Sequence, residues 1–118
     1  MFLNLKHKEL DAYKVSKILV KEIYLLSGKL PFEERFNMVQ QLRRAGLSVK
    51  LNLAEGCSRR SGIERKRFFE VARGSAIEID ATLETAFELG YLKNDDLNII
   101  GDLLNRCFAM LTKMISNI

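Results

Sequence analysis

The chain has 118 residues, of which 47% are hydrophobic, with a single proline and no tryptophan. This composition excludes an intrinsically disordered protein and provides enough apolar side chains for one compact core. The formal net charge of +4 leaves both nucleic acids and acidic protein surfaces as partners.

The first residues lack the long apolar segment of a signal peptide, and no run of about 18 apolar residues predicts a membrane span. The two cysteines, Cys57 and Cys107, form neither a disulfide framework nor a CxxC motif. We therefore expect a cytoplasmic protein without membrane contact and with reduced thiols. It forms one domain over residues 1–118, in which residues 1–7 are an N-terminal arm.

Positive charge is concentrated in the middle of the chain. Residues 43–73 contain nine Lys or Arg against three acids, whereas residues 74–118 contain three against seven. A protein with a basic middle and an acidic end can attract a polyanion or join basic to acidic surfaces in an oligomer.

The first half of the chain predicts two helices. Apolar residues recur every three to four positions over residues 8–27, and Gly28 follows as a helix end. Pro31 is suited to begin a second helix, predicted over residues 32–55. Within it, residues 47–53 alternate between apolar and polar as in a strand. We favour a helix because this spacing gives two apolar faces, one formed by Leu42, Ala45, Val49 and Leu53, the other by Leu47, Leu51 and Ala54.

The second half predicts two more helices. Ser61 and Glu64 have the spacing of a capping box at the start of a helix over residues 62–89, in which Gly74 suggests a close helix crossing. Asn94 is a candidate cap for a helix over residues 95–116. Because the connections are short, the sequence predicts an all-α, antiparallel, up-down-up-down four-helix bundle.

A resemblance to a known family rests on residues along nearly the whole chain. They are Pro31, Glu34 to Phe36, Gln41 to Ala45, Ser48-Val49, Asn52 to Gly56, Arg59, Phe68-Phe69, Ala72, Gly74-Ser75, Glu78 and Gly90 to Leu92. On these residues the chain resembles the 23S ribosomal RNA intervening-sequence proteins, also called S23 ribosomal-like. Accessory variability proteins of diversity-generating retroelements are related bundles. Many members have proline where this chain has Lys50.

The resemblance implies a bacterial, all-helical protomer that assembles into a ring, expected to be a homopentamer, with a basic surface suited to nucleic acid. It implies no enzymatic activity. An accessory partner of a reverse transcriptase is another role among such bundles. A protein-interaction scaffold without nucleic-acid binding is therefore the alternative function.

Eight basic side chains are candidates for contacts with RNA or DNA phosphates, which require cations but no sequence code. They are Arg43, Arg44, Arg59, Arg60, Arg65, Lys66, Arg67 and Arg73. The alternative is that they pair with Glu55, Glu70, Glu78 and Asp80 or are solvated. For Arg43 and Arg44 we favour a structural role, because they lie within the helix that has two apolar faces.

A second candidate group is polar and structural. Arg44, Ser48, Asn52 and Glu55 lie at spacings of three to four residues and can form a network that fixes helix or subunit register. We favour this role over catalysis for Asn52 and Glu55.

Enzymatic functions have little support, and we expect no catalytic residues, no metal and no cofactor. His7 is the only histidine, so the Glu-x-x-His pairs of a di-iron bundle are missing. A weak alternative is a magnesium-dependent nucleotide hydrolase that uses Glu78, Asp80, Glu84 and Glu88. Cys57 can have a lowered pKa beside Arg59 and Arg60, but no general base accompanies it, and Cys107 belongs to the predicted core.

Overall fold

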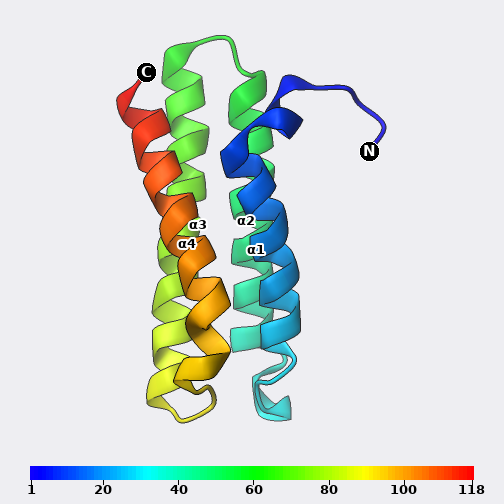
Figure 1. The fold of residues 1–118 in the computed structure, drawn as a ribbon, viewed down its shortest axis with the longest axis vertical. Coiled ribbons are helices and arrows are strands. Elements are labelled where there is room, and N and C mark those ends of the chain that lie inside the picture. Colours follow the sequence, from blue (N-terminus) through cyan, green and yellow to red (C-terminus); the bar gives the residue numbers. More distant parts are fainter.

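The computed structural model describes residues 1–118 and contains four α-helices and no strands, which confirms the predicted fold class (Figure 1). The helices are α1 (Asp11–Ser27), α2 (Met38–Ser58), α3 (Gly62–Glu88) and α4 (Asn94–Ser116). Two 3-10 turns, η1 (Lys6–Glu9) and η2 (Phe32–Glu34), precede α1 and α2. Successive helices run in opposite directions, and each packs against two neighbours in an elongated bundle of 44 × 30 × 23 Å.

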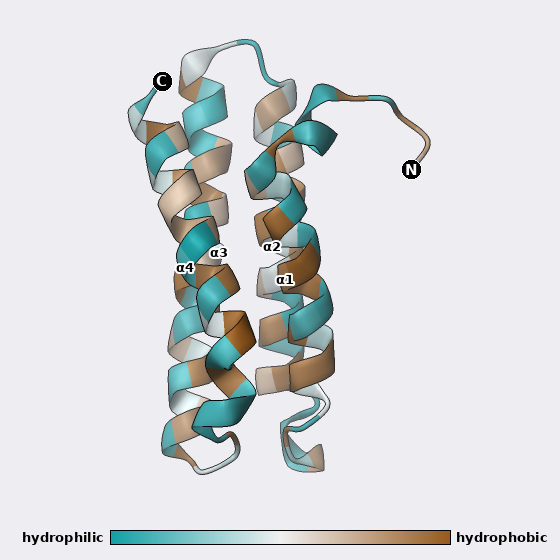
Figure 2. Ribbon diagram, viewed as in Figure 1, coloured by the Kyte–Doolittle hydropathy of each residue, from teal (hydrophilic) through white to brown (hydrophobic).

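The core consists of 23 buried apolar side chains, and Figure 2 shows apolar segments turned toward the inside of the bundle. In α2, the predicted inner face of Leu42, Ala45, Val49 and Leu53 is buried, so the alternating segment is helical as predicted. On the predicted second face, Leu47 is 38% and Leu51 57% exposed. The helix therefore presents an apolar surface that the protomer itself does not cover.

The start of α2 differs from the prediction. Pro31 does not begin the α-helix, because its extended backbone leads into 3-10 turns in which Glu34 N–H donates to Pro31 O (2.9 Å) and Asn37 N–H to Glu34 O (3.0 Å). Asn37 has non-helical angles (φ −126°, ψ −94°), so the α-helix begins only at Met38. As a consequence Phe36, which lies within the predicted helix over residues 32–55, falls before α2 and is 77% exposed.

The roles of two glycines also differ from the prediction. Gly56 lies inside α2, although the predicted helix ended at residue 55 and a connection was expected after it. The absence of a side chain at Gly56 lets Phe69 of α3 approach closely. A Cβ atom at Gly56 would lie 2.6 Å from Phe69 Cε1. At Gly74, in contrast, a Cβ atom would have no neighbouring atom within 4 Å, so the close crossing expected there is absent.

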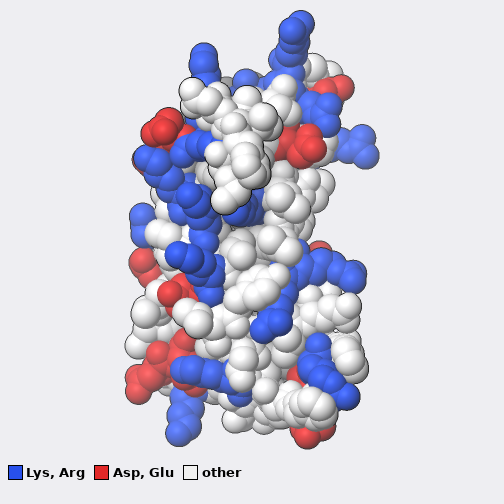
Figure 3. All heavy atoms as spheres, turned by 90° about the vertical axis from the view of Figure 1, so that its right-hand side faces the viewer, with Lys and Arg blue, Asp and Glu red and all other residues white.

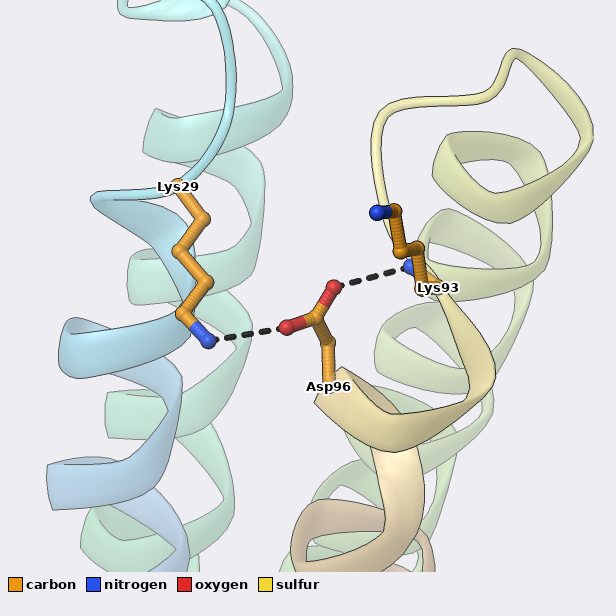
Figure 4. Close-up of polar contacts among 3 residues, drawn as sticks. All are labelled: Lys29, Lys93 and Asp96. Atoms are coloured by element: carbon orange, nitrogen blue, oxygen red, sulfur yellow. Dashed lines mark hydrogen bonds and ion pairs between the residues drawn. The ribbon is translucent and has the colours of Figure 1, made fainter.

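The helix starts are stabilised by side chains, one as predicted and one not. Ser61 Oγ accepts a hydrogen bond from Glu64 N–H (3.1 Å), as the capping box predicts. At α4 the cap position belongs to Lys93 and not to Asn94, because the Asp96 carboxylate reaches back to accept from Lys93 N–H (2.8 Å; Figure 4).

No helix combines the length and the apolar content that a membrane crossing requires.

Candidate nucleic-acid interface

Five of the eight candidate cations lie together at one end of the bundle, at the top in Figure 1. We call this the basic end and define it by Arg59, Arg60, Arg65, Lys66 and Arg67. Arg59 and Arg60 belong to the connection between α2 and α3, and the other three lie in the first turns of α3. The short connection and the Ser61 cap fix the start of α3, so the two sets of cations lie side by side.

The positive charge at the basic end is largely uncompensated. Arg59 donates to Glu55 (2.9 Å), one helical turn away, and its guanidinium lies 4.9 Å from the Phe68 ring centre. None of the other four forms an ion pair, and all five are exposed. The alternative pairing with Glu70, Glu78 and Asp80 is absent.

Three open hollows surround the basic end. The first, of about 410 Å³, is lined by Asn52, Arg59, Glu64, Arg67, Phe68 and Val71. The second, of about 610 Å³, is lined by Ile63, Lys66, Arg67, Glu70 and Val71. The third, of about 410 Å³, is lined by Leu5, Lys6, His7, Leu10, Cys57, Ser58 and Arg65. Cations therefore border concave surfaces on several sides of this end.

The remaining three candidates lie elsewhere. Arg43 Nε donates to Ser27 Oγ (2.9 Å), and its guanidinium lies 4.7 Å from the Tyr24 ring centre, so Arg43 joins α2 to α1. Arg73 donates to Thr112 (3.3 Å) on α4. Arg44 is exposed and unpaired, but it lies about 22 Å along the helix axis from Arg59. The structure does not bring these three to the basic end.

The polar residues of α2 separate into two groups. Asn52 Nδ2 donates to Ser48 O (2.8 Å) and to Ser48 Oγ (3.1 Å), and the hydroxyl of Ser75 on α3 donates to Ser48 Oγ (2.7 Å). Glu55 pairs with Arg59 instead, and Arg44 contacts neither group. The Ser48 contact therefore links α2 to α3. The sequence-based prediction missed Ser75, although it lies one position before Ala76 on the buried stripe.

Basic residues near the N-terminal arm enlarge the positive surface, and the sequence-based prediction did not include them. Lys8 Nζ donates to the carbonyl of Leu3, and the neighbouring Lys8 side chain is the main cause that lowers the pKa of the Met1 amino group. The positive charges of Lys17 and Lys50 also lower the pKa of the Met1 amino group. Figure 3 shows Lys and Arg atoms spread over the face formed by α1 and α2, with acidic atoms mostly near its edges. In the sequence, the cluster Lys6-His7-Lys8 is the feature that could have identified these basic residues.

The two thiols are not activated. Burial raises the pKa of Cys57 and outweighs the charge of Arg65, which contradicts the lowered pKa that its neighbours in sequence suggested. Cys107 is fully buried in the core, as predicted, and burial raises its pKa to about 11. Neither cysteine has the thiolate character that nucleophilic catalysis requires.

The acidic residues of α3 do not converge on a metal site. No group of three or more His, Cys, Asp or Glu side chains is placed to hold a metal ion. Glu78, one of the four acids of the magnesium alternative, accepts a hydrogen bond from Gln41 Nε2 (2.8 Å) on α2.

Fold and charge together define a class of protein, a four-helix bundle with exposed cations gathered at one end. Comparison with protein families then gives the particular family. The model of the 23S rRNA-intervening sequence protein matches residues 8–113, so the chain belongs to this family, as the resemblance predicted. The family's description names no reaction. Comparison with curated proteins gave no match.

Proposed function

We propose that the protein is a non-catalytic nucleic-acid-binding protein that contacts RNA or DNA phosphates through its basic end. The observation that carries this proposal is the lack of carboxylate partners for Arg60, Arg65, Lys66 and Arg67. Cations that serve only the fold or solubility are commonly interspersed with acids. The family name, which refers to an insertion within ribosomal RNA, agrees with such a ligand.

The expected binding is electrostatic and not base-specific. Guanidinium and ammonium groups on the surface neutralise phosphates and release counterions, so the affinity depends on salt more than on sequence. The basic end has no row of aromatic side chains on a sheet, which RNA-binding modules use to stack bases. Structured RNA or an RNA–DNA hybrid, both with closely spaced phosphates, is therefore the expected ligand.

The test is fluorescence anisotropy of labelled RNA and DNA at a series of salt concentrations. We expect log K to fall linearly with log salt, with a slope of about 0.7 to 0.9 per phosphate contact. The double variant Arg60→Ala/Arg67→Ala removes two unpaired, exposed cations. It should weaken binding to all sequences and reduce the slope by about two.

The control is Lys21→Ala/Arg106→Ala, which removes the same formal charge from α1 and α4, outside the basic end; Lys21 is unpaired, and Arg106 forms only an exposed pair with Asp102 (3.8 Å). If binding follows total charge, the two double variants weaken it equally, and the basic end is not the interface. Absence of binding by the wild-type protein at low salt rejects the proposal altogether.

The second candidate function is a protein-interaction scaffold, and the exposed outer face of α2 favours it. Leu47 and Leu51 on this face are only partly covered within the protomer, with 38% and 57% of their surface exposed. Assembly into a homo-oligomer, the pentamer that the resemblance implies, would bury them, and so would a partner such as a reverse transcriptase. Light scattering on wild-type protein and Leu51→Asp tests this function. A monomeric wild-type protein contradicts self-assembly.

A further inference from the structure

The third hollow at the basic end has a distinct composition. Each of the other two hollows has a glutamate in its wall, Glu64 in one and Glu70 in the other. The third has none, and three groups that are or can become cationic line it, Lys6, His7 and Arg65. It is therefore the most favourable place on this end for an anion.

Local structure holds the arm side of this groove in place. η1 packs against α1 and α2, and its backbone is closed by hydrogen bonds from Lys8 N–H to Leu5 O (3.2 Å) and from Leu10 N–H to His7 O (3.0 Å). The imidazole of His7 lies edge-on to the Tyr13 ring, with 4.6 Å between centroids. Lys6 and His7 therefore belong to an anchored turn that faces Arg65 across the groove.

Two acids close to the groove are engaged elsewhere, and two others, Asp11 and Glu64, do not line it. Glu9, the acid of η1 itself, lies 3.7 Å from Lys14 Nζ, and Glu55 on α2 is paired with Arg59. The hydroxyl of Ser58 in the wall donates its hydrogen to Glu55 O (2.7 Å), so the donors left for an anion are the cationic side chains. The groove thus offers cationic donors to an anion without a competing carboxylate in its wall.

We propose that this groove is a phosphate-binding subsite for a nucleic-acid strand, formed by Lys6, His7 and Arg65. Leu5 and Leu10 supply an apolar wall for the sugar or base next to the bound phosphate. The inference rests on the proposed function and assigns the N-terminal arm a part in it. The phosphate lies between η1 and the first turns of α3, so that the strand crosses the junction of α2 and α3.

His7 gives the subsite a reporter of its own, because it is the only histidine in the chain. In the free protein partial burial and the neighbouring Lys8 lower the pKa of His7. A phosphate in the groove stabilises the imidazolium and raises this pKa. The other ionisable groups near His7 are the Met1 amino group, Lys6, Lys8 and Glu9 of the arm and η1, Tyr13 from α1, Cys57 and Lys50 from α2, and Arg65 from α3.

The experiment is proton NMR of the His7 imidazole during a pH titration, with and without a short oligouridylate. Its internal phosphodiesters do not titrate near neutral pH, so a changed midpoint reports on His7. We expect the His7 pKa to rise by about one pH unit, which corresponds to about tenfold tighter binding of the protonated form. Lys6→Ala/Arg65→Ala should abolish the rise, and Lys21→Ala/Arg106→Ala should preserve it.

The outcomes separate this inference from the proposed function. If anisotropy detects RNA binding but the His7 pKa stays constant, the basic end binds RNA and the subsite is rejected. If inorganic phosphate raises the His7 pKa but no RNA binds, the groove is a site for small anions, and both the strand assignment and the proposed function fail. Circular dichroism of the variants checks that these exposed substitutions leave the helices intact.

Discussion

The two ends of the bundle are held by different interactions. At the end opposite the basic end, which we call the paired end, Lys29 contacts Asp96 (2.8 Å), Tyr91 donates to Glu34 (3.3 Å), and Asn37 donates to Glu34 (3.0 Å). Figure 4 shows how Asp96 joins the end of α1 to the start of α4. Two of these contacts, Lys29 with Asp96 and Tyr91 with Glu34, join segments that lie far apart in the sequence, whereas the contact of Asn37 with Glu34 is local.

At the basic end, apolar packing holds the helices together. Phe69 is fully buried against Gly56, and the one ion pair, between Arg59 and Glu55, lies within a single stretch of chain. Four of the five cations there contribute no ion pair that holds helices together. The difference suggests that charge at the paired end serves the fold, whereas charge at the basic end is available for a ligand.

The largest expected effect is on the packing of the basic end. Gly56→Ala places a methyl group 2.6 Å from Phe69 Cε1 and 3.1 Å from Phe68 Cβ, and the buried ring has little room to move. We expect a loss of about 1–3 kcal/mol in the free energy of unfolding, as for other overpacked cores. Urea denaturation followed by circular dichroism measures it.

Gly74→Ala is the matched control, because the same change is made in open space within α3. Alanine is the better helix former and reduces the entropy of the unfolded chain, so this variant should gain about 0.5–1 kcal/mol. If both variants lose stability equally, close packing at Gly56 is not what holds the basic end.

These two glycines also show what the sequence could and could not predict. Helical periodicity predicted four helices and the buried face of α2, because burial follows the spacing of apolar residues within one segment. Whether a glycine lies at a close crossing depends on a residue from another helix. The ring that requires Gly56 is Phe69, on the far side of a turn, so we predicted a connection at Gly56 and a crossing at Gly74.

The candidate site shows the same limit. The cluster from Arg59 to Arg67 was predictable because its members are close in sequence on either side of one turn. Lys6 and His7 are visible in the sequence as part of a basic cluster, but their proximity to Arg65 was not predictable, because only the packing of η1 brings them there. Likewise, the separation of Arg43 and Arg44 from this cluster follows from the length of α2, along which some 15 residues extend about 22 Å.

A smaller effect is expected from breaking the paired end. Asp96 has a lowered pKa in the folded protein because its carboxylate accepts hydrogen bonds from Lys29 and from Lys93 N–H. A carboxyl group whose pKa is lowered on folding stabilises the folded state above its ordinary pKa of 3.8. That contribution is lost as the pH falls through the folded-state value.

Asp96→Asn should therefore lower the melting temperature at neutral pH, and the difference from wild type should shrink as the solution becomes strongly acidic. Thermal melts over a pH series measure it. Asp95→Asn, next to it in the first turn of α4 but without these partners, is the control and should have a smaller effect. A difference that stays constant with pH would show that the ionised carboxylate is not what stabilises this end.

The smallest effect on stability is expected from replacing a cation at the basic end, and this replacement should not destabilise the protein. Lys66 forms no ion pair, and its charged neighbours are Arg65, Arg67 and, one turn further on at the same hollow, Glu70, so Lys66→Gln removes a charge but no direct contact. We expect the free energy of unfolding to change by no more than about 0.5 kcal/mol, with a neutral or stabilising effect.

The comparison variant is Lys29→Gln, which removes the contact with Asp96 and should lower the melting temperature. Because added salt screens both interactions, the two melting temperatures should converge as ionic strength rises. If Lys66→Gln destabilises the protein as much as Lys29→Gln does, the cations of the basic end hold the fold together and are not free for a ligand.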